Sequence, residues 1–178
     1  MIRFFDLLIS FFGLLILSPI LIILLIACLL ENNSPIFRQQ RVGHNQKLFE
    51  IIKFRSMRMN TKSVATHLVD SSMITPLGTF LRRTKLDEVP QLFNVVLGDM
   101  SLVGPRPCLK NQNKLIYERK KRGVFKVKPG ITGLAQISGI NMKTPVLLAK
   151  IDQKMIKEMN LYNYFYYIFK TIFKLKFH

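Results

Sequence analysis

The sequence predicts a mostly helical α+β protein in which one apolar segment enters a membrane and a small α/β domain follows it. Three observations predict this class. Residues 7–30 form an uninterrupted uncharged run, and the whole chain carries 27 Lys and Arg against 10 Asp and Glu, a formal charge of +17. Two short strand-like segments follow, and the later candidates for regular structure are helical. The 178 residues amount to one domain.

The N-terminal segment is long enough to enter a bilayer. A cleavable signal peptide would have a shorter apolar core and small residues at a cleavage site, and residues 28–32 (CLLEN) offer no such site. A proline in mid-helix removes a hydrogen bond and produces a kink, so Pro19 predicts a bend. Ser18 beside it can satisfy a freed carbonyl inside lipid. A membrane span and a re-entrant hairpin that bends at Ser18-Pro19 fit these residues equally well.

The basic charge indicates the surface on which the rest of the chain lies. From Arg38 onward the sequence is rich in Lys and Arg, and each basic residue near an anionic cytoplasmic leaflet contributes on the order of 1 kcal/mol. Nucleic acid would attract the same charge, but no zinc spacing, basic heptad or aromatic-rich strand signature supports it. Cys28 and Cys108 are isolated, which predicts neither a disulfide nor a zinc site. We expect a reduced domain on an anionic membrane, without nucleic acid.

Two short strands and several helices are expected in the rest of the chain. Residues 35–43 and 48–55 predict a hairpin around a Gly-His-Asn-Gln turn. Residues 61–75 are polar and aperiodic, which favours a surface loop. Helical segments are expected at residues 78–83, at 91–97 with a stop at Gly98, and at 111–121 as a charged, solvated helix.

Residues 162–178 alternate aromatic side chains with lysines. In a helix, the apolar side chains share one side while the lysines reach outward. Such an amphipathic helix can lie in the lipid interface, and it can equally pack on the protein core.

Residues 84–91 (TKLDEVPQ) place two adjacent carboxylates before a proline. If residues 88–96 are helical, Asp87 lies at the N-terminus, where free N–H groups and the helix dipole stabilise an anion. Glu88 is then an ordinary acid of the first turn. Because carboxylates are scarce in this chain, the pair also indicates a chemical role. The residues alone leave both interpretations open.

Three further groups of residues suit phosphate. Lys53 and Arg55 alternate along a predicted strand and so share one face. Arg106 lies between two prolines behind a glycine turn, and its planar guanidinium matches phosphate oxygens. Residues 126–133 (KVKPGITG) place cations next to glycines, whose backbone N–H groups can approach an anion closely. Each group could equally serve a structural purpose.

Taken in this order, the motifs resemble those of the bacterial sugar transferase family, the small monotopic phosphoglycosyl transferases. The matching strings are the apolar segment with Ser18-Pro19, PIFRQQRVG, IIKFRSM, LRRTKLDEVPQLFNVVLGDMSLVGPRP and KPGITGLAQISG. The resemblance implies that residues 1–30 form a re-entrant helix-break-helix in the inner membrane with both ends cytoplasmic. It also implies that residues 31–178 form a catalytic domain on the cytoplasmic face, which ends in an interfacial helix.

The resemblance further implies a reaction. Members transfer a sugar phosphate from a UDP-sugar to polyprenyl (undecaprenyl) phosphate and release UMP, which is the first membrane step of bacterial surface glycan synthesis. By this likeness Asp87 is the nucleophile, which forms a phosphosugar-aspartyl intermediate. Glu88 matches the second acid, which is expected to hold Mg²⁺ against the diphosphate.

Basic positions also match the family. Lys53, Arg82 and Arg106 are expected to bind phosphate, and Lys128 and Gly130 are expected near the nucleotide. The chain departs from the family pattern at other positions, notably at Leu134 and Tyr164, which puts the sugar contacts in doubt.

Two other classes of function were weighed against this one. A glycosidase needs carboxylates about 5 to 9 Å apart that flank a bond, and neighbouring side chains on a helix diverge. A non-catalytic basic scaffold on the membrane is the remaining alternative, and only activity separates it from an enzyme.

Overall fold

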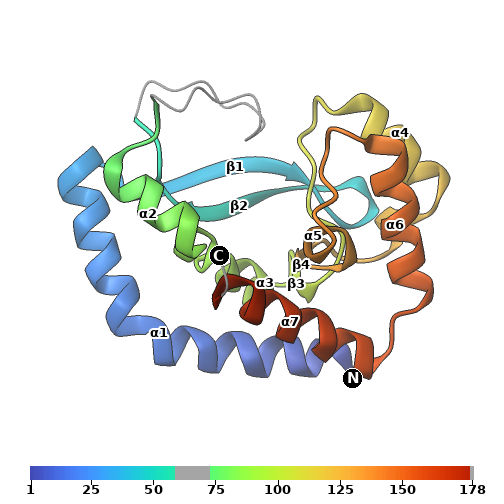
Figure 1. Ribbon diagram of the computed structural model, residues 1–178, viewed down its shortest axis with the longest axis horizontal. Helices are drawn as coiled ribbons and strands as arrows, with labels where there is room; N and C mark the ends of the chain where they lie inside the picture. Colours follow the sequence, from blue (N-terminus) through green and yellow to red (C-terminus); the bar gives the residue numbers. More distant parts are fainter. Residues whose placement is uncertain (59–72, 177–178) are drawn as a thin grey trace.

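A computed structural model describes residues 1–58 and 73–176 and shows a mostly helical α+β fold (Figure 1). The predicted fold class is confirmed at this level. A long helix α1 (Ile2–Asn32) runs along one side of the molecule, and β1 (Ile36–Val42) and β2 (Leu48–Phe54) form a hairpin above it. The elements that follow are α2 (Pro76–Thr84), the 3-10 turn η4 (Leu86–Glu88), α3 (Gln91–Leu97), β3 (Ser101–Val103), α4 (Asn113–Lys121), the 3-10 turn η5 (Val124–Lys126), β4 (Gly130–Thr132), α5 (Leu134–Ile137), α6 (Pro145–Lys157) and α7 (Leu161–Lys176).

Helix α1 bends sharply partway along its length (Figure 1) and contains Pro19. Pro19 has no N–H to donate to the carbonyl of Leu15, four residues earlier. The Ser18 hydroxyl donates to that carbonyl instead, at 2.8 Å. The expectation that the serine satisfies the freed carbonyl is confirmed. Within the described residues, α1 is the helix that is long and apolar enough to cross a membrane.

A buried carboxylate fastens the first limb of α1 to the rest of the fold. Asp6 accepts hydrogen bonds from the Ser101 hydroxyl at 3.0 Å, the Leu102 N–H at 2.9 Å and the Tyr164 hydroxyl at 2.9 Å. Burial and the nearby Asp6 charge raise the pKa of Tyr164, so its phenol stays a donor. Because a buried charge is costly unless hydrogen bonds satisfy it, these three donors hold α1, β3 and α7 together.

Arg3 makes the second polar contact of this limb. Its guanidinium donates to the carbonyls of Val95 at 2.7 Å and Val96 at 3.2 Å, in the last turn of α3. A cation at a helix C-terminus satisfies free carbonyls and complements the helix dipole. Both charges of the first limb therefore dock it on the domain.

The hairpin and α3 are joined through one side chain. Asn94 is buried, its amide donates to the Glu50 carbonyl at 2.7 Å, and its side-chain oxygen accepts from the Ile52 N–H at 2.9 Å. The main core lies beneath this junction and includes Val95, Met100 and Tyr167. β3 and β4 form a separate parallel pair, which the sequence did not predict. The two hydrogen bonds of Asn94 set α3 at a defined position against β2.

The interpretation of Asp87 as the N-cap of a helix over residues 88–96 is wrong, whereas the expected helix over residues 91–97 is confirmed as α3. Lys85 ends α2 in the left-handed conformation, with φ of 60°. Residues 86–88 then form the turn η4, and α3 begins only after Pro90. Because the proline ring fixes φ and suits a helix start, the helix starts there. Asp87 lies inside η4 and is not the N-cap of α3.

Most other predicted elements are confirmed, with changed bounds. The two strands of the hairpin pair antiparallel, with Ile36 opposite Phe54 at one end and Val42 opposite Leu48 at the other. Helix α3 ends at Gly98. Helix α2 is longer than the expected turn because Thr75 caps it by accepting from the Gly78 N–H. In the predicted loop, residues 61–72 lie outside the described residues. Ile74 pairs with Met57 in an isolated bridge.

Two helices are less exposed than the sequence suggests. The predicted solvated helix is α4, whose Leu115 and Arg119 are buried against neighbouring elements. For helix α7, packing on the core is confirmed, and an interfacial position in lipid stays a prediction. Its Tyr164 and Tyr167 pack on the core, while a second side remains exposed through Tyr162, Phe165, Tyr166, Phe169, Ile172 and Phe173.

We predict that the bend in α1 determines its topology. Each limb is too short to cross about 30 Å of hydrocarbon at 1.5 Å per residue. Replacing Ser18 and Pro19 together by leucine removes the kink, so the N-terminus should move across the membrane while the basic domain stays inside. Labelling of a cysteine placed at the N-terminus measures this. Labelling from the periplasm in the unmodified protein would contradict the hairpin.

Candidate active site

Glu88 lies at the centre of a buried ion-pair cluster. Its Oε1 accepts from the Lys53 ammonium at 2.9 Å and from the Arg106 guanidinium. Lys53 comes from β2, Glu88 from η4, and Arg106 from the loop after β3. The side chain of Glu88 is only 13% exposed and that of Lys53 only 15%. Three segments distant in sequence thus meet on one carboxylate oxygen.

The charges in this cluster determine its protonation. Burial by itself raises the pKa of Glu88, but the charges of Arg106 and Lys53 and their hydrogen bonds outweigh it and hold this pKa well below its usual range. Burial lowers the pKa of Lys53, and Glu88 only partly offsets this effect. Glu88 raises the pKa of Arg106. Glu88 therefore stays ionised, and its charge serves two cations at once.

Asp87 differs from Glu88 in its hydrogen bonding and in the direction of its pKa shift. It is buried, and among the described residues its Oδ1 has no hydrogen-bond partner. Burial raises its pKa, as does the Glu88 charge, while the charges of Lys53, Lys85 and Arg82 oppose the rise. A buried carboxylate oxygen without a donor is poorly stabilised as an anion. Two adjacent carboxylates with pKa values shifted in opposite directions are typical of a site that divides chemical roles.

Arg82 lies in the last turn of α2 and faces the same region. Its Nε donates to the Ser56 hydroxyl at 2.8 Å, which fixes the guanidinium, and its positive charge acts on Asp87.

Arg55 behaves differently from the prediction that it shares a phosphate-binding face with Lys53. Its guanidinium donates to the Ser34 carbonyl at 2.9 Å and stacks on the Phe37 ring.

A second buried ion pair holds the loop that carries Arg106. Arg119 on α4 pairs with Asp152 on α6 at 2.8 Å, and its Nη1 donates to the Arg106 carbonyl at 2.8 Å. Sequence reasoning missed both residues, because a buried pair between two helices leaves no pattern in a single sequence. The pair positions the backbone of Arg106 and so supports its contact with Glu88.

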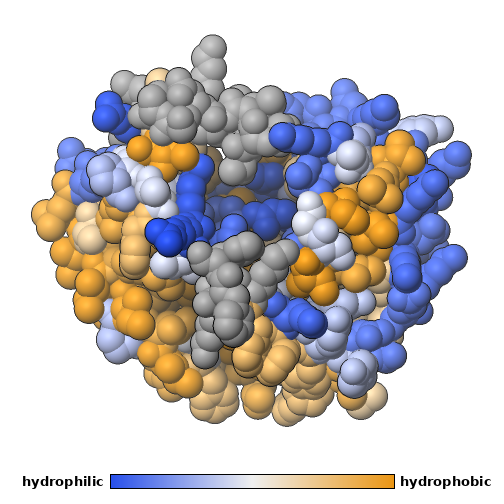
Figure 2. Space-filling model, viewed as in Figure 1, coloured by the Kyte–Doolittle hydropathy of each residue, from blue (hydrophilic) through white to orange (hydrophobic). Residues whose placement is uncertain are grey.

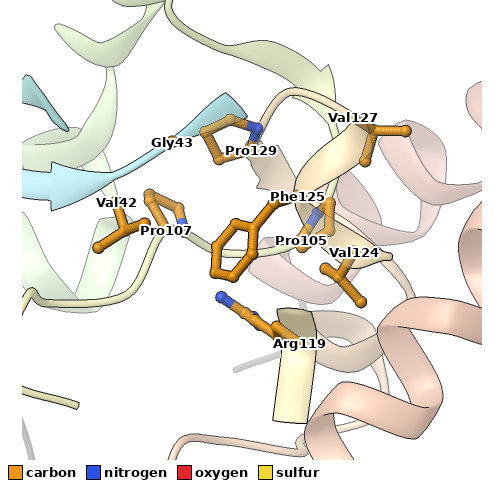
Figure 3. Close-up of a pocket in the computed structure, with 9 residues that line it drawn as sticks. All are labelled: Val42, Gly43, Pro105, Pro107, Arg119, Val124, Phe125, Val127 and Pro129. Carbon is orange, nitrogen blue, oxygen red and sulfur yellow. The ribbon is translucent and has the colours of Figure 1, made fainter. Parts of the chain in front are cut away.

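The loop is also packed from behind. Figure 3 shows Pro105, Pro107 and Pro129 gathered around the ring of Phe125, with Arg119 beside it. The cavity among them has a volume of about 10 Å³, which is room for about one water. It is too small for a substrate, so it belongs to the packing that supports the loop.

Lys128 and Gly130 lie apart from the carboxylates. The Lys128 ammonium lies next to Gly98, which follows the C-terminal end of α3: a Cβ added to this glycine would be 3.6 Å from it. Asp87 and Glu88 precede the N-terminal end of the same helix. The Gly130 N–H donates to the Pro105 carbonyl at 3.0 Å, and a Cβ there would clash with the backbone of Gly104. These contacts explain Gly130 by close strand packing.

The face of the molecule over the β1–β2 hairpin is hollowed (Figure 2). Figure 2 shows a recess with hydrophilic walls over the middle of the β1–β2 hairpin, while the apolar side chains gather along α1 and α7 below it. Large apolar side chains are exposed on α1 throughout its length. A polar recess thus stands next to a broad apolar surface.

Within the described residues, no group of three or more His, Cys, Asp or Glu side chains could hold a metal ion. Mg²⁺ in phosphate-binding sites generally uses one or two carboxylates together with substrate phosphates and water. The ionised Glu88 carboxylate fits that smaller donor set.

Comparison with known proteins identifies the family. The sequence profile described as bacterial sugar transferase matches residues 1–178. The chain belongs to the bacterial sugar transferase family. The resemblance found in the motifs is thus confirmed, and the carboxylate pair of this family member lies in its longest matching string.

Curated relatives of this family member carry functional names. It is 39% identical to "UDP-glucose:undecaprenyl-phosphate glucose-1-phosphate transferase" of Escherichia coli K12, over 95% of this chain and 39% of the relative. It is 38% identical to "Undecaprenyl-phosphate galactose phosphotransferase" of Salmonella typhimurium LT2, over 95% and 39%. It is 32% identical to "Exopolysaccharide production protein ExoY" of Sinorhizobium fredii, over 96% and 83%. The chain spans about two fifths of the length of the first two relatives.

We predict that the two carboxylates of this family member affect its stability in opposite directions at neutral pH. Glu88→Gln leaves Lys53 and Arg106 without their counterion and should lower the free energy of unfolding by about 3 kcal/mol. Asp87→Asn removes a buried charge whose Oδ1 lacks a donor among the described residues, and it should raise the free energy of unfolding by about 1 kcal/mol, or roughly 2–4 °C in Tm.

Both effects should diminish as the pH falls. The pKa of Glu88 is lowered in the folded state, so its contribution is complete above the ordinary glutamate pKa and is lost as the pH falls through the folded value. The pKa of Asp87 is raised, so its cost is present above the folded value and vanishes below the ordinary aspartate pKa. Thermal unfolding of both variants across this range measures the changes. Equal effects of the same sign would contradict the assignment.

Proposed function

We propose that this protein is a phosphoglycosyl transferase that moves a sugar phosphate from a UDP-sugar to undecaprenyl phosphate. The products are polyprenyl diphosphosugar and UMP, and the step begins the synthesis of a bacterial surface glycan. The single observation that carries the proposal is the Oδ1 of Asp87, which has no hydrogen-bond partner in the part of the chain that the structure describes and lies next to the Glu88 ion-pair cluster. The substrate classes follow the printed names of the relatives.

In the first step an oxygen of Asp87 attacks the β-phosphorus of the UDP-sugar. The new bond joins this oxygen to phosphorus, the bond to the bridging oxygen breaks, and UMP leaves with that electron pair. Because Asp87 Oδ1 has no hydrogen bond to lose among the described residues, it can attack without first breaking one. Arg82, Lys53 and Arg106 supply positive charge for the phosphate oxygens around it.

In the second step an oxygen of undecaprenyl phosphate attacks the phosphorus of the aspartyl intermediate. The bond to the Asp87 oxygen breaks, the carboxylate is restored, and a diphosphate joins lipid and sugar. Two displacements at one carboxylate let a soluble donor and a membrane lipid use the site in turn. The polar recess beside an apolar surface suits two substrates of such different solubility (Figure 2).

Glu88 has two tasks in this proposal. It holds Lys53 and Arg106 in place through Oε1, and it is the residue that would hold Mg²⁺ with the substrate phosphates. A bound Mg²⁺ would neutralise charge on the diphosphate and favour departure of UMP. Because the charges of Arg106 and Lys53 and their hydrogen bonds outweigh the effect of burial and keep Glu88 ionised, this carboxylate remains available as an oxygen ligand over the physiological pH range.

The membrane arrangement supports the same function. We propose that α1 is a re-entrant hairpin in the inner membrane, bent at Ser18-Pro19, and that the domain lies on the cytoplasmic face. The exposed aromatic side of α7 would rest in the lipid interface, and the formal charge of +17 favours an anionic leaflet. The recess would then open where a lipid phosphate can reach it.

We predict that Asp87→Asn abolishes transfer. The amide cannot form the phosphosugar ester, so UMP release from a panel of UDP-sugars with undecaprenyl phosphate should fall by at least about 1000-fold. Intact-mass analysis of the unmodified protein with UDP-sugar and no lipid should show an adduct that the variant lacks. Substantial turnover by the variant would defeat the mechanism, and a non-catalytic scaffold would release no UMP at all.

We also predict a requirement for a divalent cation. Chelation with EDTA should stop UMP release, and added Mg²⁺ should restore it. Glu88→Gln should be weakened in a way that excess Mg²⁺ restores only in part, because the variant loses a charged ligand as well as its two ion pairs. The dependence of rate on Mg²⁺ concentration measures this. Full activity in excess EDTA would exclude a metal at Glu88.

A further inference from the structure

Arg41 lies at the edge of the active site, although sequence reasoning assigned it no role. It is the last residue but one of β1, and the next residue, Val42, donates its N–H to the Cys108 carbonyl at 2.9 Å. The Arg41 Nη1 donates to the Pro107 carbonyl at 3.3 Å. The end of β1 is thus fastened to the loop that carries Arg106, which brings the two guanidinium groups together.

The charge of Arg41 is poorly compensated. Its Nε is buried and has no hydrogen-bond partner in the described part of the chain, and none of the ion pairs there includes it. Burial lowers its pKa to about 10, and the neighbouring Arg106 adds to this effect. Glu88 attracts it, but that carboxylate already serves Lys53 and Arg106. Arg41 is still protonated at neutral pH and lacks an anion of its own.

Arg41 is partly buried, and a cation withdrawn from water without a counterion costs free energy unless a ligand supplies the missing charge. Arg38, on the same strand, provides the contrast. Its side chain is 67% exposed and pairs with Glu50 at 3.8 Å, as a surface arginine does. Arg41 uses two donors on Pro107 and Gln39, so further N–H groups of its five remain for another acceptor. A planar guanidinium with free donors suits the oxygens of a phosphate group.

We propose that Arg41 is a phosphate-binding residue of this active site, which works with Arg106 on the phosphate that Asp87 does not attack. This proposal rests on the proposed function and deepens it. Two substrates carry such a phosphate: the nucleotide, whose α-phosphate leaves in UMP, and the lipid phosphate that attacks next. In both cases the chemistry recognised is a phosphate anion beside the reacting phosphorus.

The first test uses inorganic pyrophosphate and UMP as probes, with binding to the full-length protein in nanodiscs measured by calorimetry. Arg41→Gln should raise the Kd of both probes about tenfold or more, since hydrogen bonds to charged groups have this strength. Arg41→Lys should recover part of the affinity because it keeps the charge but loses the fork. Arg38→Gln on the same strand is the control and should bind as the unmodified protein does.

Thermal unfolding without ligand separates binding from folding. A lower Tm of Arg41→Gln together with unchanged Kd values would show that Arg41 only holds the Pro107 loop, and this would overturn the proposal. The lack of any pyrophosphate or UMP binding by the unmodified protein would overturn it too. Because binding of pyrophosphate requires no turnover, the proposed function can fail in the UMP-release assay while this site is still tested.

The kinetic test distinguishes the two sources of phosphate. If the α-phosphate of the nucleotide is bound, Arg41→Gln should raise the KM for the UDP-sugar about tenfold and leave that for undecaprenyl phosphate unchanged. If the lipid phosphate is bound, the KM for the lipid should rise instead. Weaker pyrophosphate binding with both KM values unchanged would place the anion site outside the reaction and overturn the proposal.

Discussion

The ion-pair cluster of Glu88 with Lys53 and Arg106 is the interaction on which the rest of the site depends. A carboxylate this deeply buried is tolerated because two cations reach it, and the buried Lys53 ammonium in turn depends on the carboxylate. The three segments that carry these charges must therefore stay together. Asn94 between α3 and β2, and Arg119 on the Arg106 carbonyl, hold two of those segments in place.

Asp87 is the exception that this framework permits. Glu88 forms the ion pairs with Lys53 and Arg106. The Oδ1 of Asp87 is buried without a hydrogen-bond partner among the described residues. The fold thus provides one stable anion and one destabilised anion at adjacent positions of a 3-10 turn. Such a division is expected where one acid organises charge and the other forms a covalent bond. The surrounding ion pairs and the helix that follows Pro90 offset the free-energy cost of the buried Asp87 carboxylate.

The membrane segment is integrated into this domain by its polar residues. Arg3 and Asp6, the two charges of the first limb, bond to α3, β3 and α7. Tyr164, one of the departures from the family pattern, is a donor to Asp6 and so has a structural task here. Because α3 begins just after the carboxylate pair and ends at Arg3, one short helix links the active site to the apolar limb. The position of the apolar limb and the position of the site are therefore coupled.

The sequence by itself determined the class of the fold, the hairpin of β1 and β2, the bend at Pro19 and the carboxylate pair, because local chemistry decides each of them. Alternation, turn residues and proline geometry act over a few positions, and long ordered motifs identify a family. Only the tertiary structure decided which charges meet. In the tertiary structure Asp87 lies in a turn and not at a helix cap, Arg55 bonds to Ser34, and Lys128 lies at the far end of α3. The structure also shows the buried Nε of Arg41 and the ion pair between Arg119 and Asp152. Burial and ion pairing depend on residues tens of positions apart, and no local pattern in one chain records which of them come into contact.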